Sequence, residues 1–123
     1  MAKRVLIADP DDSIVVSLEF LLHRAGYTVV VVDQASDLLD RVVSEAADVV
    51  VIADEQRGGL DGFELCRAVC AAKPAPPVLM LAARARDADA AKARAVGAAD
   101  FLAKPFPTRD FLERVARLAT EAV

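Results

Sequence analysis

The stretch DVVVIAD, residues 48–54, places five consecutive apolar residues between two aspartates. A continuous run of Val, Ile and Ala predicts a short strand that is covered on both faces, as strands in parallel sheets are. Asp54 follows directly at the end of this strand, where a polar, glycine-containing loop begins. The run therefore favours an α/β domain in which helices cover the sheet.

Similar short apolar runs occur on both sides of this stretch and alternate with helical patterns. We predict strands at residues 4–8, 27–32, 49–53, 78–82 and 101–103. The helices are predicted to begin at a cap among residues 11–13, at Ser36, near Phe63, at Asp87 and at Thr108. The second helix is expected to face the core with Leu38, Leu39, Val42, Val43 and Ala46. Five such units predict a (βα)5 fold, a doubly wound five-stranded parallel sheet with helices on both faces.

Length and composition limit the function classes. The 123 residues are the usual size of one domain, so residues 1–123 are predicted to form one unit. The net charge of −4, the lack of a Lys/Arg cluster and the absence of Trp argue against direct nucleic-acid contact. No apolar run approaches the roughly 20 residues of a membrane span, and the apolar stretch after Arg4 ends at Asp9. We expect a cytoplasmic domain that does not contact a membrane.

Cys66, Cys70 and His23 have two interpretations each. The cysteines lie four residues apart and could form a redox pair, or they could be two small hydrophobic residues on one helix face. We favour the second, because only two cysteines are present and the compartment is expected to be reducing. A zinc site needs about four ligands, so we expect His23 to be an ordinary surface residue.

Three charged residues follow three of the predicted strands. Asp9, Asp54 and Lys104 come after the first, third and fifth strands, where open α/β sheets bind their ligands. Two carboxylates at one edge repel each other unless a cation lies between them. Mg²⁺ prefers such oxygen ligands and keeps several waters. Two carboxylates, a divalent cation and a lysine around an open space indicate a phosphoryl-transfer site.

Other phosphate-binding folds lack their motifs in this sequence. No Gly-x-Gly-x-x-Gly follows the first strand, and no Gly-x-x-x-x-Gly-Lys-Ser/Thr occurs. No Ser-His-Asp set is available either. A small nucleotide-binding α/β protein remains an alternative, which tight binding of a nucleotide or flavin would identify.

Four segments resemble the receiver domains of bacterial response regulators. They are VLIAD at 5–9, DVVVIAD at 48–54, LDGFEL at 60–65 and GAADFLAKPF at 97–106, and the resemblance covers essentially the whole chain. In that family an aspartate lies eight residues before the glycine of the Asp-Gly-Phe/Tyr-Glu segment, and here Asp54 lies eight residues before Gly62. The resemblance implies a flavodoxin-like receiver fold with a cis Lys104-Pro105 bond.

The resemblance also implies a role for each site residue. Asp54 matches the nucleophile that takes a phosphoryl group from a phosphohistidine. Asp9 matches the first of two acidic residues that organise Mg²⁺, and Gln56 matches the residue whose main-chain carbonyl ligates that metal. Lys104 matches the lysine that contacts the acyl phosphate. Phe101 matches the aromatic switch residue.

Three positions depart from the family pattern. Pro10 replaces the second acidic residue, a direct metal ligand, so Mg²⁺ binding is expected to be weakened; Asp11 could substitute in part. Ala82 replaces the Ser or Thr switch residue that hydrogen-bonds the phosphoryl group. A charged hydrogen bond contributes about 1.5–3 kcal/mol, so the coupling between phosphorylation and rearrangement is expected to fall by roughly that amount. Gly58 replaces a proline in the loop after Asp54.

The leading hypothesis is a receiver domain in two-component phosphorelay signalling, not an enzyme. Asp54 would accept a phosphoryl group, with Mg²⁺, from a sensor histidine kinase or phosphotransfer protein and change its contacts with an output domain or protein. The resemblance implies a homodimer or docking surface on the fourth helix, fifth strand and fifth helix. Its candidate salt-bridge residues are Lys92, Arg94, Asp100, Arg109, Asp110, Glu113 and Arg117. The alternative is a degenerate receiver that binds partners without phosphorylation.

Overall fold

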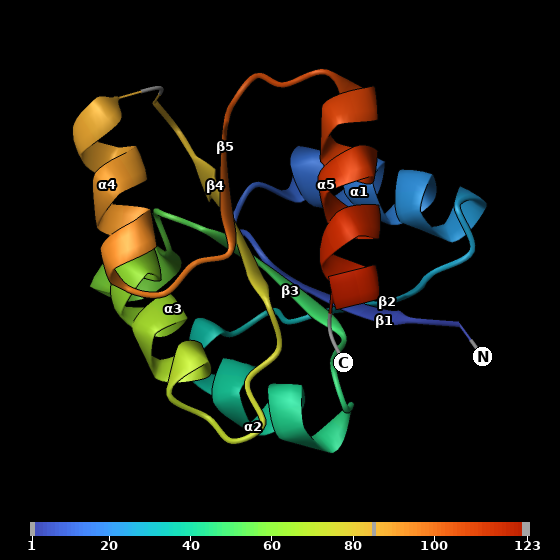
Figure 1. The fold of residues 1–123 in the computed structure, drawn as a ribbon, viewed down its shortest axis with the longest axis horizontal. Coiled ribbons are helices and arrows are strands. Elements are labelled where there is room, and N and C mark those ends of the chain that lie inside the picture. The colour runs from blue at the N-terminus through green and yellow to red at the C-terminus, as the bar shows by residue number, and fades with distance from the viewer. Residues whose placement is uncertain (1, 85, 122–123) are drawn as a thin grey trace.

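The computed structural model describes residues 2–84 and 86–121 (Figure 1). Its strands are β1 (Arg4–Ala8), β2 (Thr28–Val31), β3 (Val49–Ala53), β4 (Val78–Ala82) and β5 (Asp100–Ala103). Its α-helices are α1 (Asp12–Arg24), α2 (Leu38–Ser44), α3 (Gly62–Cys70), α4 (Asp87–Ala95) and α5 (Thr108–Glu121). Short 3₁₀ turns at Ala35–Asp37 and Arg57–Gly59 precede α2 and α3.

The five strands form one parallel sheet with the order β2-β1-β3-β4-β5. Helices α1 and α5 cover one face of the sheet, and α2, α3 and α4 cover the other (Figure 1). The predicted doubly wound (βα)5 fold is therefore confirmed.

Alternate residues of each strand enter two separate cores. In β3, Val49 and Val51 pack with α1 and α5, whereas Val50 and Ile52 pack with α2, α3 and α4. All five β3 residues are buried, which explains why the run is continuously apolar. Each core is closed by helix residues at helical spacing, such as Leu18 and Leu22 of α1.

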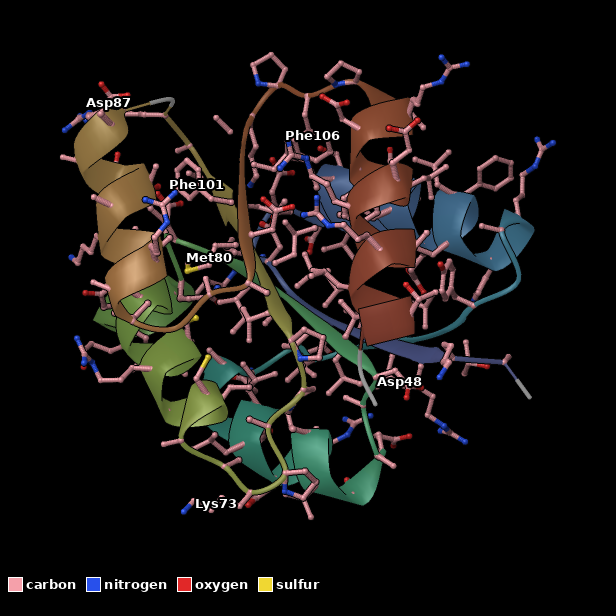
Figure 2. The ribbon with its side chains drawn as sticks, in the orientation of Figure 1. Asp48, Lys73, Met80, Asp87, Phe101 and Phe106 are labelled. Carbon is pink, nitrogen blue, oxygen red and sulfur yellow. The ribbon has the colours of Figure 1, made fainter. Side chains whose placement is uncertain are left out.

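Because all strands are parallel, their carboxyl ends lie at one edge of the sheet. Figure 2 shows this edge at the top, where Asp87 begins α4 and Phe106 precedes α5. Asp48 and Lys73, which precede β3 and β4, lie toward the opposite end. Residues that follow β1, β3, β4 and β5 are therefore brought together at the upper edge.

The prediction for the second helix was partly wrong. Ser36 lies in a 3₁₀ turn and does not cap α2, which spans only Leu38–Ser44. Leu38 and Val42 are buried as predicted, but Leu39 and Val43 are 42% and 75% exposed. A helix of two turns presents one buried i, i+4 stripe to the sheet, and the flanking apolar residues face solvent.

Cys66 and Cys70 pack in α3, and His23 lies on the surface of α1. Cys66 is buried in α3, and its sulfur lies 3.9 Å from that of Cys70, so both thiols are free. Burial, reinforced by Cys70, raises the pKa of Cys66 to about 12, which keeps this thiol protonated at neutral pH. The interpretation as two small hydrophobic residues therefore holds, and His23 is exposed on α1 as expected.

No helix among the described residues has the length and apolar character needed to cross a bilayer.

Candidate functional site

Asp9 and Lys104 form an ion pair at the upper edge of the sheet. Asp9 follows β1 and Lys104 follows β5, and Lys104 Nζ lies 2.9 Å from Asp9 Oδ2. The Asp9 side chain is 0% exposed and that of Lys104 is 21% exposed. Asp9 Oδ1 accepts a hydrogen bond from the Asp11 N–H at 2.9 Å. Oδ2 accepts no aligned hydrogen bond from the described residues, so the Lys104 ammonium is its charge partner.

Asp54 is held by main-chain groups at the end of β3. Its N–H donates to the Leu81 carbonyl at 2.8 Å, and its carbonyl accepts from the Gly62 N–H at 3.0 Å. The two carboxylate oxygens accept from the Ala83 N–H at 3.3 and 3.4 Å. The side chain is partly exposed, so a reactant can approach it from solvent.

Several neighbouring groups act on the pKa of the Asp54 carboxyl group. Partial burial raises the pKa of Asp54 above its ordinary value of 3.8, and the negative charge of Glu55 adds to this. The Ala83 N–H and the Lys104 charge act in the opposite direction. Ala83 is hydrogen-bonded to Asp54, and Lys104 pairs with Asp9 at the same edge of the sheet.

Gly62 allows α3 to approach Asp54 closely. A Cβ atom at Gly62 would lie 2.0 Å from the Ala53 carbonyl oxygen and 2.7 Å from Asp54 Cα. Asp61 begins the helix by accepting a hydrogen bond from the Phe63 N–H at 2.8 Å. The Asp-Gly pair therefore fixes the start of α3 against the main chain of Asp54.

We expect Asp54→Asn to stabilise the chain slightly at neutral pH. Because the pKa of Asp54 is raised on folding, its ionised form disfavours the fold above that pKa, and this penalty disappears as the pH falls toward 3.8. The gain should stay below about 1 kcal/mol, since solvent screens a partly exposed carboxylate. Urea unfolding at several pH values measures it. Asp33→Asn, at an exposed carboxylate, is the matched control, and an equal or larger gain in that control would contradict the assignment.

Pro10 and Asp11 are the two residues that follow Asp9, where a second acidic metal ligand was expected. Pro10 offers no side-chain oxygen, and Asp11 Oδ1 caps α1 by accepting from the N–H groups of Ser13 and Ile14. Hydrogen bonding to Ser13 is the main cause of the lowered pKa of Asp11. Asp11 therefore serves helix capping, as one of the three predicted cap candidates.

Gln56 and Arg57 place nitrogen donors near the same edge. Gln56 Nε2 donates to the carbonyls of Ala8 and Ala53 at 2.9 and 2.8 Å, which joins the ends of β1 and β3. Arg57 Nη2 donates to the Pro10 carbonyl at 2.8 Å. Among the residues that the structure describes, no three Asp, Glu, His or Cys side chains group as a metal site. This donor set does not fit a magnesium site with a full complement of carboxylates.

The two switch candidates lie on β4 and β5. Ala82 is completely buried and has no hydroxyl that could bind a phosphoryl oxygen, and the next residue supplies only its N–H. Phe101 is half-buried and packs on the side of the sheet that faces α4, as Figure 2 shows. The Lys104-Pro105 bond is cis, as the resemblance implies.

The surface formed by α4, β5 and α5 contains a charge cluster centred on Asp100. Arg114 lies 2.6 Å from Asp100 Oδ1, and Arg117 lies 2.5 Å from Oδ2. Arg117 and Asp100 were among the sequence candidates, but Arg114 was missed. Its position two turns into α5 gave no sequence signal beyond i, i+3 spacing with Arg117. Lys92 instead contacts Asp61 of the preceding helix cap at 3.9 Å.

Comparisons with known proteins agree with this architecture. The response regulator receiver domain family matches residues 5–116. The chain is 34% identical to the alkaline phosphatase synthesis transcriptional regulatory protein PhoP of Bacillus subtilis, over 94% of this chain and 48% of that protein. It is also 34% identical to the transcriptional regulatory protein CreB of Escherichia coli, over 93% of this chain and 49% of that protein. The chain thus spans about half the length of these two relatives.

A solved structure shows the same fold. The chemotaxis response regulator CheY4 of Vibrio cholerae superimposes with a TM-score of 0.86 at 27% identity, over 96% of this chain and 99% of that chain.

Proposed function

The chain belongs to the response regulator receiver domain family, and we propose that Asp54 accepts a phosphoryl group from a sensor histidine kinase or phosphotransfer protein. Receiver domains are signalling domains of two-component systems and are generally not enzymes. In this proposal residues 1–123 form one cytoplasmic receiver domain that is not itself an enzyme. The observation that carries it is the partly exposed Asp54 carboxylate beside Ala83 N–H and the Lys104–Asp9 pair.

The proposed reaction is a displacement at phosphorus. A carboxylate oxygen of Asp54 forms a bond to phosphorus while the bond from phosphorus to the donor's imidazole nitrogen breaks, and that imidazole takes up a proton from solvent. In this proposal the Ala83 N–H and the Lys104 ammonium would donate to phosphoryl oxygens; the Ala83 N–H already binds the Asp54 carboxylate. Lys104 would then divide its charge between Asp9 and the new phosphoryl group.

Receiver domains generally use Mg²⁺ for phosphorylation. In this chain the oxygen donors that remain for a metal are the carboxylates of Asp9 and Asp54 and the main-chain carbonyl of Gln56. Pro10 removes one carboxylate from this set, so in our proposal Mg²⁺ binding is at most weak.

We also propose how phosphorylation would be communicated. Ala82 and Phe101 occupy the switch positions, and the α4-β5-α5 surface is the proposed site of homodimerisation or contact with an output domain or protein. Asp100 of that surface is already paired within the chain, which leaves exposed partners such as Arg109 and Glu113 for contacts between chains. Direct contact with nucleic acid is not part of the proposal.

Mass spectrometry of the intact chain after incubation with acetyl phosphate tests the proposed function. Here the Asp54 oxygen displaces acetate from phosphorus, and we expect the mass of one phosphoryl group to be added and mapped to the peptide containing Asp54. Asp54→Asn should remain unmodified, whereas the control Asp40→Asn, at an exposed carboxylate of α2, should be modified like wild type. Equal modification of Asp54→Asn, or none in wild type with or without Mg²⁺, would overturn the proposal.

Pro10 and Ala82 favour a second candidate, a receiver that binds its partner without phosphorylation. In that case a partner protein would bind Asp54→Ala as tightly as the wild type. A large loss of binding by a folded Asp54→Ala variant would exclude this candidate.

A further inference from the structure

The loop after Asp54 follows a main-chain path that a proline at position 58, as the family resemblance implies, would prevent. Gly58 and Gly59 have φ values of +72° and +74°, whereas proline is fixed near −65°. An antiparallel bridge between Glu55 and Asp61 closes the base of this loop. The two left-handed glycines therefore give the segment just before them a path that a proline at residue 58 could not.

Arg57 reaches from this loop to the segment between β1 and α1. Its Nη2 atom donates to the Pro10 carbonyl at 2.8 Å and lies 3.6 Å from Asp12 Oδ1. Position 10 is the one to which the family resemblance assigns a direct metal ligand, and the guanidinium binds the main chain of this residue. An arginine keeps its positive charge at all accessible pH values.

The guanidinium lies along a cleft that also borders Asp9. This cleft has a volume of about 200 Å³ and is lined by Asp9, Pro10, Asp12, Gln56 and Arg57, among others. Three aspartates line this cleft: Asp9 is paired with Lys104, Asp12 lies 3.6 Å from Arg57, and Asp33 is exposed. Gln56 and Arg57 therefore bring side-chain nitrogen donors to this cleft, and neither of them adds a carboxylate.

We infer that this receiver site excludes Mg²⁺ at millimolar concentrations and works without it. The exclusion follows from the missing carboxylate at Pro10 and from the positive charge of Arg57, which contacts the Pro10 carbonyl from a side chain that is 66% exposed. The part of the inference that concerns phosphorylation rests on the proposed function of Asp54. The part that concerns metal binding does not, and it is tested separately.

A Mg²⁺ titration of the unphosphorylated chain, followed by NMR of its backbone amides, tests the metal-binding part. In wild type we expect no saturable shifts at residues 9–12 and 54–58 in the millimolar range. Arg57→Gln combined with Pro10→Asp should bind Mg²⁺ saturably and at least about tenfold more tightly than wild type, because ligand charge sets affinity. Arg57→Gln alone should give a smaller gain, and it keeps the test valid if the double variant does not fold.

Arg67→Gln is the matched control, because it removes one positive charge from an exposed arginine that pairs with Glu64 on α3. It should leave Mg²⁺ binding unchanged. Saturable Mg²⁺ binding to wild type in the millimolar range, or equal behaviour of Arg57→Gln and Arg67→Gln, would overturn the inference.

The phosphorylation part is tested by the level of phosphorylated wild type with Mg²⁺ and with EDTA. Equal levels support the inference, and a level that collapses in EDTA contradicts it. If wild type is phosphorylated under neither condition, the proposed function fails, while the titration still decides whether Arg57 excludes the metal.

Discussion

Gly62→Ala is expected to lower the free energy of unfolding by about 3 kcal/mol or more, the range of severe single substitutions. The added methyl group would lie 2.0 Å from the Ala53 carbonyl oxygen and 2.8 Å from Asp54 C. Both are main-chain atoms, so the clash cannot be relieved by a side-chain rotation. Relief requires α3 to move away from β3, which breaks the Gly62 N–H hydrogen bond to the Asp54 carbonyl.

Urea unfolding followed by circular dichroism measures this effect. Gly59→Ala is the matched control, because Gly59 has a left-handed φ of +74° but nothing within 4 Å of its missing Cβ. The control should cost only the left-handed strain, about 1–2 kcal/mol. If Gly62→Ala cost no more than Gly59→Ala, the close approach of α3 to Asp54 would be refuted.

Lys104→Met is expected to cost about 2–3 kcal/mol of unfolding free energy, somewhat less than the loss of a partner from a fully buried pair. Methionine retains the apolar stem but removes the ammonium that lies 2.9 Å from Asp9 Oδ2. Asp9 would then remain 0% exposed with a carboxylate oxygen that has no charge partner among the described residues.

The charge explanation is tested by a double-mutant cycle. Asp9→Asn combined with Lys104→Met removes both charges, so it should recover more than half of the loss seen in Lys104→Met alone. A double variant that is less stable than the Lys104→Met single variant would show that the apolar packing of residue 104, and not its charge, holds this edge of the sheet.

The central strands could be predicted from sequence because their buried positions are occupied by consecutive apolar residues. The predicted bounds of β1, β3 and β4 agree with the structure, since each is an apolar run with polar or proline-containing segments beside it. The second helix was harder, because Leu39 and Val43 are apolar and exposed. Nothing in the local pattern distinguishes such residues from the buried Leu38 and Val42.

The site was predictable only where residue type determines chemistry. Asp9, Asp54 and Lys104 follow β1, β3 and β5, so the parallel topology puts all three at the carboxyl edge of the sheet. The roles of Ala83 and Arg57 depend on a main-chain N–H and on the reach of a long side chain between two loops. Neither leaves a pattern in the sequence, and the capping role of Asp11 could not be separated from that of its neighbours.

The alternation of β3 side chains divides the hydrophobic interior into two compartments that have no side chain in common. A change in volume at Val51 must be accommodated by α1 or α5, whereas one at Ile52 must be accommodated by α2, α3 or α4. Compensating substitutions are therefore needed only within one compartment at a time. Sequence drift on the two sides of such a partition can proceed independently, which is one route by which relatives only 34% identical retain a common architecture.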